Sequence, residues 1–554
     1  MVETANAAPR PAPAAPPLGG ARGPTFVPNE QFQHLQFCIH SNPSWPATFL
    51  LGFQHYIVML GSTVLIANIL VPQMGGDQGD KARVIQTLLF MAGLNTLFQT
   101  LIGTRLPTVM SASFTYIIPV LAIINDNPRQ NFTSDHQRFL HIIRTIQGCL
   151  IVSSFVNIIL GFSKTWGNLT RFFSPLVLVP VICVVGLGPF LRGFPLLANC
   201  VEIGLPMLIL LVIIQQHLKQ YLKRIHDLAQ DTLERFGLLF CIGIAWAFAA
   251  ILTAAGAYNN VGVQTKQSCR VDQTFPISSA PWIKMPYPFQ WGTPIFSASH
   301  VFGMIGAALV TSAESTGTFY AAARLAGATP PPAHILSRSI GLQGIGTLLE
   351  GIFGSVVGTT ASVENVGLLG LTYIGSRRVV QISTSFMIFF SIFGKFGAFF
   401  ASIPLPIFAA IYCVLYGIVA AVGISFTQFV NTNNLRNLYV LGLSLFLGIS
   451  ISQYFVRNTN MNTGNGPVKT GAGWFNDILN TIFSSSPTVA IIVGTLVDNT
   501  LEAKHTASER GLPWLVPFQR RNGDSRNDEF YSLPMRFHEY IPSIPLPKFN
   551  RPHV

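Results

Sequence analysis

Apolar runs of membrane-spanning length recur along the chain, and they limit its fold more than any other feature. A helix needs about 20 apolar residues to cross ~30 Å of hydrocarbon. We find fourteen candidate runs, at 46–70, 85–103, 106–124, 145–163, 172–190, 197–216, 236–256, 295–323, 340–358, 360–373, 379–400, 405–424, 437–455 and 485–500. The sequence therefore predicts an all-α polytopic membrane protein with fourteen transmembrane spans.

Charged residues are scarce, as this prediction requires. They make up 10% of the chain, whereas a soluble protein carries about 25%. The net charge of +12 does not indicate nucleic-acid binding, because the basic residues lie in short loops between the apolar runs and in the C-terminal tail, as in proteins that face anionic lipid. The seven cysteines form no CxxC pair, and we expect them to be small buried hydrophobes. We expect no cofactor and no metal.

Two of the runs are poor ordinary helices, and they match in position if the fourteen spans divide as seven and seven. The third run carries Pro107 and Pro119 on either side of Phe114, and the tenth is short and follows the polar stretch 358–362. An odd number of spans per half makes the second half enter the bilayer from the opposite side. Interrupted segments at matching positions of two inverted repeats are a pointer to a transporter site.

This division predicts the domain plan. Residues 1–44 begin with an Ala/Pro-rich stretch and form a disordered tail. Residues 45–256 form the first inverted repeat (spans 1–7), 257–294 an extracellular loop, 295–500 the second inverted repeat (spans 8–14), and 501–554 a cytoplasmic C-terminal tail. Basic residues do not fix the orientation once both tails are set aside, but we expect both termini to be cytoplasmic and the protein to lie in the plasma membrane.

Ionisable side chains inside a bilayer are costly and mostly functional. The runs contain His55, Glu314, Glu350, Glu364 and Lys395, and His300 lies near the start of the eighth. Simpler roles compete for three of them. Lys395 can snorkel or pair, Glu350 can pair with a neighbouring helix, and His300 fits the membrane interface.

Glu314 and Glu364 are the better site candidates, because each lies in a polar stretch of an apolar span. A nucleobase presents ring N–H donors to carboxylates and carbonyl acceptors to free backbone N–H groups, which broken spans supply. Phe114 can cover the flat face of a base, or it can contact lipid or pack in the core. The neighbours Gln54 and His55 point about 100° apart on a helix, so one can line the site while the other ties helices together.

At this point the chain resembles the nucleobase–ascorbate transporter family (nucleobase–cation symporter 2). The family signature reads Gln, Glu or Pro, then Asn, any residue, Gly, four of any kind, Thr, and finally Arg, Lys or Gly. This chain has Glu364, Asn365, Gly367 and Thr372 at the first four defined positions. Gln54-His55 resembles the first-span pair, and Glu314 with the three residues after it resembles the eighth-span acid. The resemblance covers about residues 30–500 and is closest to plant members.

The resemblance implies a core domain that carries substrate, a gate domain that forms a homodimer, and short extended segments in spans three and ten. It implies that Glu314 and Glu364 bind a base through their carboxylates. Phe114 and Val363 would offer backbone amides, with Phe114 also stacking and Asn365 in support. Glu at the first signature position is typical of base carriers and Pro of ascorbate carriers. The expected cargo is therefore xanthine, uric acid, guanine, adenine or uracil, moved by alternating access.

Two positions depart from the family pattern. Tyr373 stands where the signature has Arg, Lys or Gly, and Thr318 stands where many members carry an acid or His implicated in cation coupling. We prefer H+ as the coupling cation, with Na+ possible, and take Glu314 and Thr318 as the coupling candidates.

Several other functions compete with a base carrier. An ascorbate carrier would use the same scaffold. A sulfate-permease-type anion transporter shares the seven-plus-seven plan, but it usually carries a soluble C-terminal domain, and its sulfate would be repelled by carboxylates. An enzyme is disfavoured because no HExxH, GxSxG or phosphate-loop pattern occurs. Unique acids in two spans suit a carrier better than a channel with a repeated pore ring.

Overall fold

The structure is a computed structural model of the chain and describes residues 35–218, 227–274, 282–459, 466–502, 505–519 and 525–533. Residues 1–34 of the predicted N-terminal tail and 534–554 of the predicted C-terminal tail lie outside the described residues.

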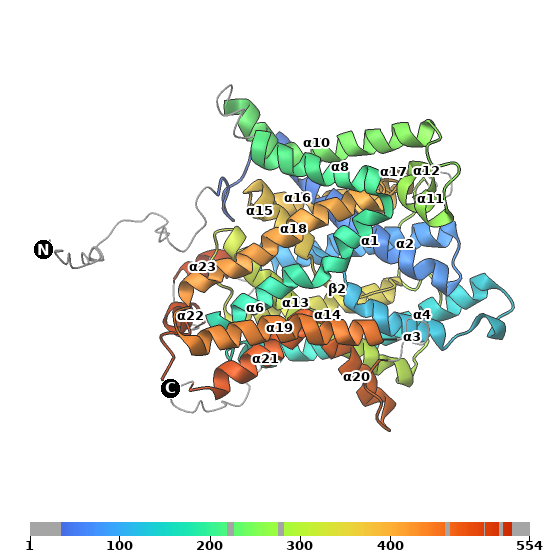
Figure 1. Cartoon of the computed structure of the whole chain (residues 1–554). Helices are drawn as coiled ribbons and strands as arrows, with labels where there is room; N and C mark the ends of the chain where they lie inside the picture. Colours follow the sequence, from blue (N-terminus) through green and yellow to red (C-terminus); the bar gives the residue numbers. More distant parts are fainter. Residues whose placement is uncertain are drawn as a thin grey trace, which may run out of the picture.

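Helices account for almost all of the regular structure in the described residues (Figure 1). Up to residue 274 the elements are α1 (Trp45–Met74), α2 (Gln78–Leu101), β1 (Met110–Ala112), η2 (Phe114–Tyr116), α3 (Ile117–Asn125), η3 (Arg129–Asn131), α4 (Asp135–Phe162), α5 (Thr165–Thr170), α6 (Pro175–Leu187), η4 (Gly188–Arg192), α7 (Phe194–Leu197), η5 (Ala198–Cys200), α8 (Val201–Val212), η6 (Ile213–Leu218), α10 (Asp227–Ala254), α11 (Val263–Cys269) and α12 (Val271–Thr274).

The remaining elements begin at Ala298, after the loop that follows α12. They are α13 (Ala298–Leu325), α14 (Ala333–Phe353), β2 (Thr359–Ala361), α15 (Val363–Thr372), α16 (Arg377–Ile392), α17 (Gly394–Ala401), α18 (Leu405–Ser425), η8 (Phe426–Phe429), α19 (Leu435–Asn458), α20 (Gly473–Phe483), α21 (Ser486–Thr500), α22 (Leu512–Gln519) and α23 (Arg526–Tyr531).

Helices overlap all fourteen of the predicted apolar runs. Within the described residues, seven helices are long and apolar enough to cross a membrane, or eight if α20 and α21, bent by 89°, form one broken span. The protein is therefore a helical multi-pass membrane protein, and its division into fourteen spans stays a prediction.

Helix packing repeats between the two halves of the chain. Helix α4 packs along α14, and α2 packs along α16. In the same way α1 contacts α16, and α13 contacts α4. The two contacts in each of these cases are equivalent under the predicted repeat. If every helix is replaced by the helix seven predicted spans away, the first contact becomes the second.

Strands β1 and β2 form a short antiparallel pair between these helices. Met110 pairs with Ala361, Ser111 with Thr360, and Ala112 with Thr359. Each strand leads into a helix, β1 through η2 into α3 and β2 into α15. Because the strands are antiparallel, η2 begins at one end of the pair and α15 at the other.

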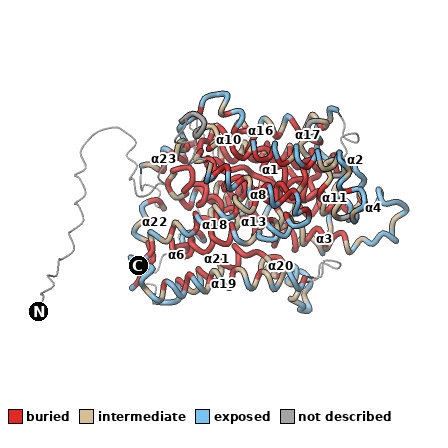
Figure 2. Tube along the Cα trace, turned by 45° about the horizontal axis from the view of Figure 1, so that its top comes forward, coloured by how far each residue is buried: buried red, intermediate tan, exposed pale blue. Residues whose placement is uncertain are grey.

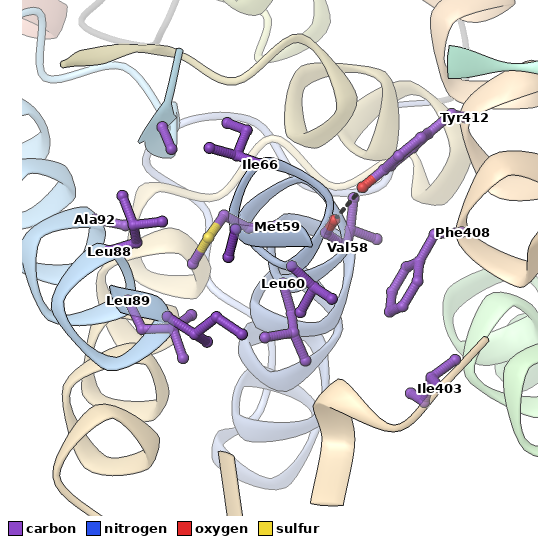
Figure 3. Close-up of a cluster of buried hydrophobic side chains, with 14 of the residues drawn as sticks. Val58, Met59, Leu60, Ile66, Leu88, Leu89, Ala92, Ile403, Phe408 and Tyr412 are labelled. Atoms are coloured by element: carbon purple, nitrogen blue, oxygen red, sulfur yellow. Dashed lines mark hydrogen bonds between the residues drawn. The ribbon is translucent and has the colours of Figure 1, made fainter. Parts of the chain in front are cut away.

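Helix α1 runs through the buried centre of the molecule (Figure 2). Met59 and Leu60 pack among apolar side chains of α2 and α18, and the Tyr412 hydroxyl donates to the Val58 carbonyl at 3.3 Å (Figure 3). A Cβ at Gly61 would lie 2.5 Å from both the Phe408 ring and the Tyr412 hydroxyl, so only glycine permits this approach of α18 to α1.

Three outer helices expose large apolar side chains. They include Leu205, Ile209 and Val212 on α8, Phe240, Ile244, Phe248 and Ile251 on α10, and Leu438, Tyr439, Phe446 and Tyr454 on α19. Soluble monomers rarely expose contiguous apolar surface on this scale. These faces are suited to lipid or to another subunit.

Parts of both predicted tails lie against the helices. Phe37 pairs with Ile374 in a single β-bridge, and the ring of His40 stacks on Phe530 of α23 at 5.4 Å. Trp514 of α22 stacks on Phe429 at 3.7 Å. Apolar residues beyond the predicted span ends make these contacts, so residues 35–44 and part of 505–533 pack on one end of the bundle (Figure 1).

The expectation that all cysteines are small buried hydrophobes is wrong for two of them. Cys200 and Cys269 form a disulfide that ties η5 to α11. Helices α11 and α12 lie at the end of the molecule opposite α22 and α23 (Figure 1). The two thiols are 69 residues apart, so only the fold brings them together.

Candidate functional site

The N-termini of η2 and α15, which follow the two strands, border one cavity. The Ser113 hydroxyl accepts a hydrogen bond from the Thr115 amide at 3.3 Å, and the Ser362 hydroxyl accepts one from the Asn365 amide at 3.3 Å. Within the described residues, no protein acceptor is recorded for the amides of Phe114 and Val363. The first N–H groups of a helix have no partner inside it, so these two amides are free to meet a ligand.

A cavity of about 230 Å³ lies in front of these N-termini. One wall is formed by Ser111, Ala112, Phe114 and Thr115, by Thr360, Ala361, Ser362, Val363 and Glu364, and by Glu314 of α13. The facing wall includes Val185, Pro189, Arg192, Gln453, Val456, Ser485 and Ser486. The structure therefore brings Glu314, Glu364, Phe114 and Val363 together around one cavity.

Glu314 is partly buried and held by two hydroxyls. Its Oε2 accepts a hydrogen bond from Thr115 at 3.0 Å, and its Oε1 accepts one from Ser485 of the facing wall at 3.2 Å. Each carboxylate oxygen has two acceptor sites, so lone pairs remain for a ligand.

Glu364 is more buried than Glu314 and accepts fewer hydrogen bonds from the protein. Its exposed fraction is 4%, and within the described residues no hydrogen bond to its carboxylate is recorded. Tyr416 of α18 lies near it. A carboxylate that is buried, borders a cavity and has no protein donor is well placed to accept from a ligand N–H.

Asn365, next in the chain, points away from the cavity. Its Oδ1 lies 3.0 Å from Nδ1 of His55, and its Nδ2 donates to Ser362 at 2.9 Å. His55 thus ties α1 to α15, one of its two expected roles. Gln54 is fully buried, and its amide atoms have no partner among the described residues. Neither Gln54 nor His55 is among the cavity-lining residues.

Arg192 is a charged cavity-lining residue that the sequence did not indicate. It ends η4, and its guanidinium carbon lies 3.5 Å from the centre of the Phe114 ring. It also lies within electrostatic reach of Glu314 and Tyr416. Its position between two apolar runs predicts a loop residue, but the chain breaks at Pro189 and turns the arginine into the cavity. A Gly-Pro pair at the end of a span was the available signal.

The two departures from the family pattern lie outside the cavity lining. The Thr318 hydroxyl donates to the backbone oxygen of Glu314 at 2.8 Å. Tyr373 ends α15 in the left-handed region at φ 57°, a position that suits glycine. It is not among the residues that line the cavity.

The other signature residues shape α15. A Cβ at Gly367 would lie 2.4 Å from the Leu415 carbonyl, so glycine allows α15 to lie against α18. The Thr372 hydroxyl donates to the Leu368 carbonyl at 2.8 Å.

The remaining ionisable candidates lie outside the cavity lining. Lys395 Nζ is 6.0 Å from the Trp282 ring, and His300 Nε2 is 2.9 Å from Asp126. Glu350 is buried and accepts from Asn95 of α2 at 3.3 Å. The only trio of metal-ligating side chains found close together in the described part of the chain is Cys200, Glu202 and Cys269, and the disulfide occupies two of them.

Comparison with known proteins finds one family model, similar sequences from a plant and distantly similar solved structures. A family model described as the permease family matches residues 46–457. The chain is 68% identical over 553 residues to nucleobase-ascorbate transporter 3 of Arabidopsis thaliana, with 98% of this chain and 100% of that relative covered. It is 57% identical over 515 residues to nucleobase-ascorbate transporter 2 of the same plant, with 93% and 97% covered. Among solved structures, the transmembrane domain of a cyanobacterium bicarbonate transporter, BicA, aligns with a TM-score of 0.41 and 12% identity over 75% of this chain and 98% of that chain.

Proposed function

Because this chain belongs to the nucleobase–ascorbate transporter family, as a member of the plant type, we propose that it is a secondary active transporter of purine or pyrimidine bases. Membership makes it a membrane transporter and not an enzyme. The cargo, the coupling ion and the transport cycle are the proposed parts.

One observation carries the base as cargo: two carboxylates and two free helix amides face one cavity beside an aromatic ring. Glu314 and Glu364 accept from ring N–H groups, and the amides of Phe114 and Val363 donate to ring carbonyls. Xanthine, uric acid, guanine and uracil present both kinds of group. The Phe114 ring stacks on the base once Arg192 has left its face.

Alternating access is the proposed cycle. The repeated helix pairings support two inverted repeats of seven spans, 45–256 and 295–500. The proposed core contains α1–α4 and α13–α16, and the proposed gate contains α6, α8, α10, α18, α19 and α21. The cavity lies between them, with Glu314 on one side and Arg192 on the other. Movement of core against gate exposes the site to each side in turn.

The proposed placement is a plasma-membrane homodimer with both termini in the cytoplasm. Disulfides persist in oxidising compartments, so the Cys200–Cys269 bond supports an extracellular position for the loop 257–294. The contacts of residues 35–44 and 505–533 at the opposite end support cytoplasmic termini. The exposed apolar faces of α8, α10 and α19 support a partner subunit in the gate.

H+ is the proposed coupling cation. Thr318 does not titrate and donates to backbone, which leaves Glu314 as the coupling candidate inside the cavity. Na+ is the alternative.

Ascorbate is the second candidate cargo, and Arg192 is the observation that favours it. A guanidinium in the cavity attracts an anion, and ascorbate is anionic at neutral pH. A sulfate-type anion is less suited, because two carboxylates border the same space.

Uptake measurements separate these cargoes. Radiolabelled xanthine, uric acid, guanine, adenine and uracil are supplied to transporter-deficient cells expressing the chain, at several pH values with and without Na+. We expect saturable base uptake that rises at acidic pH, does not depend on Na+ and is not inhibited by ascorbate. Uptake of ascorbate with no uptake of any base would replace the first candidate with the second.

A further inference from the structure

A second buried acidic site lies behind the cavity, on the polar face of α14. Gln343, Thr347 and Glu350 are spaced four and three residues apart, so they share one face of the helix. All three are at most 2% exposed. This face lies against α2, α4 and the strand pair.

Glu350 has too few partners for a buried charge. Its Oε1 accepts one hydrogen bond, from Asn95 Nδ2 at 3.3 Å, and its Oε2 has no partner among the described residues. An isolated carboxylate in an apolar interior is strongly disfavoured. The carboxylate must therefore be neutralised by a cation or by a proton.

Three buried amide oxygens on α2, α4 and α14 also lack a hydrogen-bond donor. Within the described residues Oδ1 of Asn95, Oε1 of Gln147 and Oε1 of Gln343 have no hydrogen-bond partner, and the hydroxyls of Tyr116 and Thr347 lie close to each other. Buried polar atoms without partners need an explanation. The shared shortage is of hydrogen-bond donors, and the O–H of a protonated carboxyl supplies one.

Tight packing favours a proton over a metal ion. A Cβ at Gly346 would lie 2.7 Å from Asn95 Oδ1, and one at Gly358 would lie 2.9 Å from the Tyr116 hydroxyl. Only glycines let these backbones approach, and they leave little room for an ion with its ligands. A proton needs none.

The groups that face Glu350 are neutral. Tyr116 is the titratable side chain recorded beside it, and Thr347, Gln147 and Asn95 complete the surroundings from α14, α4 and α2. Among the described residues no Lys or Arg forms a hydrogen bond or ion pair with Glu350; Arg83 lies over Trp291 at 6.0 Å, and Arg144 donates to the loop at Thr293.

Helix η2 connects this site to the cavity. Thr115 donates to Glu314 in the cavity, and the next residue, Tyr116, lies within electrostatic reach of both Glu350 and Glu314. A base that stacks on Phe114 contacts the same three-residue helix. A shift of η2 on base binding therefore changes the surroundings of Glu350.

We propose that Glu350, with Tyr116 and the polar face of α14, is a proton-binding site that couples base transport to H+ in place of the cavity acid Glu314, which stays a carboxylate that binds the base. One proton from solution binds Oε2 of the carboxylate, and the resulting O–H donates to Thr347 or Tyr116. When the base is released, the carboxyl group gives the proton back to solution and becomes a carboxylate again. This inference deepens the proposed function and rests on it for the coupling, but not for the proton site itself.

The first test needs no transport. Infrared spectra of the purified full-length protein are titrated from acidic to alkaline pH for wild type and Glu350→Gln. We expect a buried carboxylic-acid C=O band in wild type that Glu350→Gln lacks and that Na+ does not change. Identical spectra would overturn the site, and a band abolished by Na+ at fixed pH would assign it to Na+ instead.

The second test measures coupling in proteoliposomes with radiolabelled xanthine. We expect Glu350→Gln to keep xanthine counterflow but to lose accumulation driven by a proton gradient, with a flat pH profile. Glu350→Asp should recover part of the accumulation, and Glu202→Gln, at an exposed acid outside both sites, should behave as wild type. Wild-type accumulation by Glu350→Gln would overturn the proposal. If Glu350→Gln does not fold, Glu350→Asp is compared with wild type. A shifted pH profile of accumulation would then support the proposal, and an unchanged profile would overturn it.

The two tests also separate the proton site from the proposed function. A wild type that shows the infrared band but carries no base would refute the proposed function, whereas the proton site would remain supported.

Discussion

Removal of the Glu364 carboxylate should weaken base binding without weakening the fold. The side chain is 4% exposed and accepts no recorded hydrogen bond within the described residues, so its truncation strands no protein donor. A hydrogen bond to a charged group contributes ~1.5–3 kcal/mol net. At about 1.4 kcal/mol for each factor of ten, Glu364→Ala should raise the Kd for xanthine roughly 10- to 150-fold.

Glu364→Gln should give a smaller loss of affinity than Glu364→Ala, because it keeps a hydrogen-bond acceptor and loses only the charge. A neutral hydrogen bond contributes ~0.5–1.5 kcal/mol, so the amide should lose about 1 kcal/mol, or roughly fivefold in Kd. The assay is equilibrium binding of radiolabelled xanthine to purified protein, with thermal unfolding measured in parallel. Glu202→Ala, which removes an exposed carboxylate outside the cavity, is the matched control.

Two results would refute the reasoning. Wild-type affinity in Glu364→Ala would remove this carboxylate from the site. A large fall in unfolding temperature would mean that the Glu364 side chain stabilises the fold.

Three further predictions follow from charged and covalent contacts. Arg192→Ala should lower the Kd for neutral uracil by about twofold to thirtyfold, since it removes a cation–π competitor that contributes ~0.5–2 kcal/mol; a raised Kd would make the guanidinium a ligand of the base. Asp498→Ala removes the buried carboxylate that pairs with Arg436 and Arg510 and should cost about 3–5 kcal/mol in unfolding free energy, whereas Asp272→Ala, in an exposed pair, should change it by ~0–1 kcal/mol. Cys269→Ser should destabilise the protein by about 2–4 kcal/mol. In wild type, both thiols of the Cys200–Cys269 bond should react with an impermeant maleimide outside intact cells only after reduction, and labelling from the cytoplasmic side alone would reverse the proposed orientation.

The sequence predicted those features that depend on local pattern. Apolar runs located the helices, because every backbone polar group in a bilayer must be satisfied within its own segment or barrel. Glu314 and Glu364 were visible as acids inside apolar spans, and Phe114 as an aromatic residue in an interrupted one. The structure lines one cavity with all three.

Features that depend on distant parts of the chain were not predicted. Arg192 enters the cavity because the chain turns at Pro189, and a charge beside a span end looks like an ordinary loop residue. Gln54 turns into the packed interior while His55 reaches Asn365, a contact between residues 310 apart. The Cys200–Cys269 pair likewise depends on the path of two helices.

The position of Arg192 suggests how a base engages the two walls of the cavity. A guanidinium is planar and presents N–H donors, so it resembles a base in the two properties that Phe114 and the acids recognise. It extends from η4 on the proposed gate to the Phe114 ring on the proposed core, at 3.5 Å. A base that takes this face of the ring must displace the guanidinium, because both cannot stack on the same side. Binding would then exchange a contact between the two walls for a contact with cargo. Such an exchange lets cargo bias core against gate, because a ligand shifts a conformational equilibrium only through its different affinity for the two states.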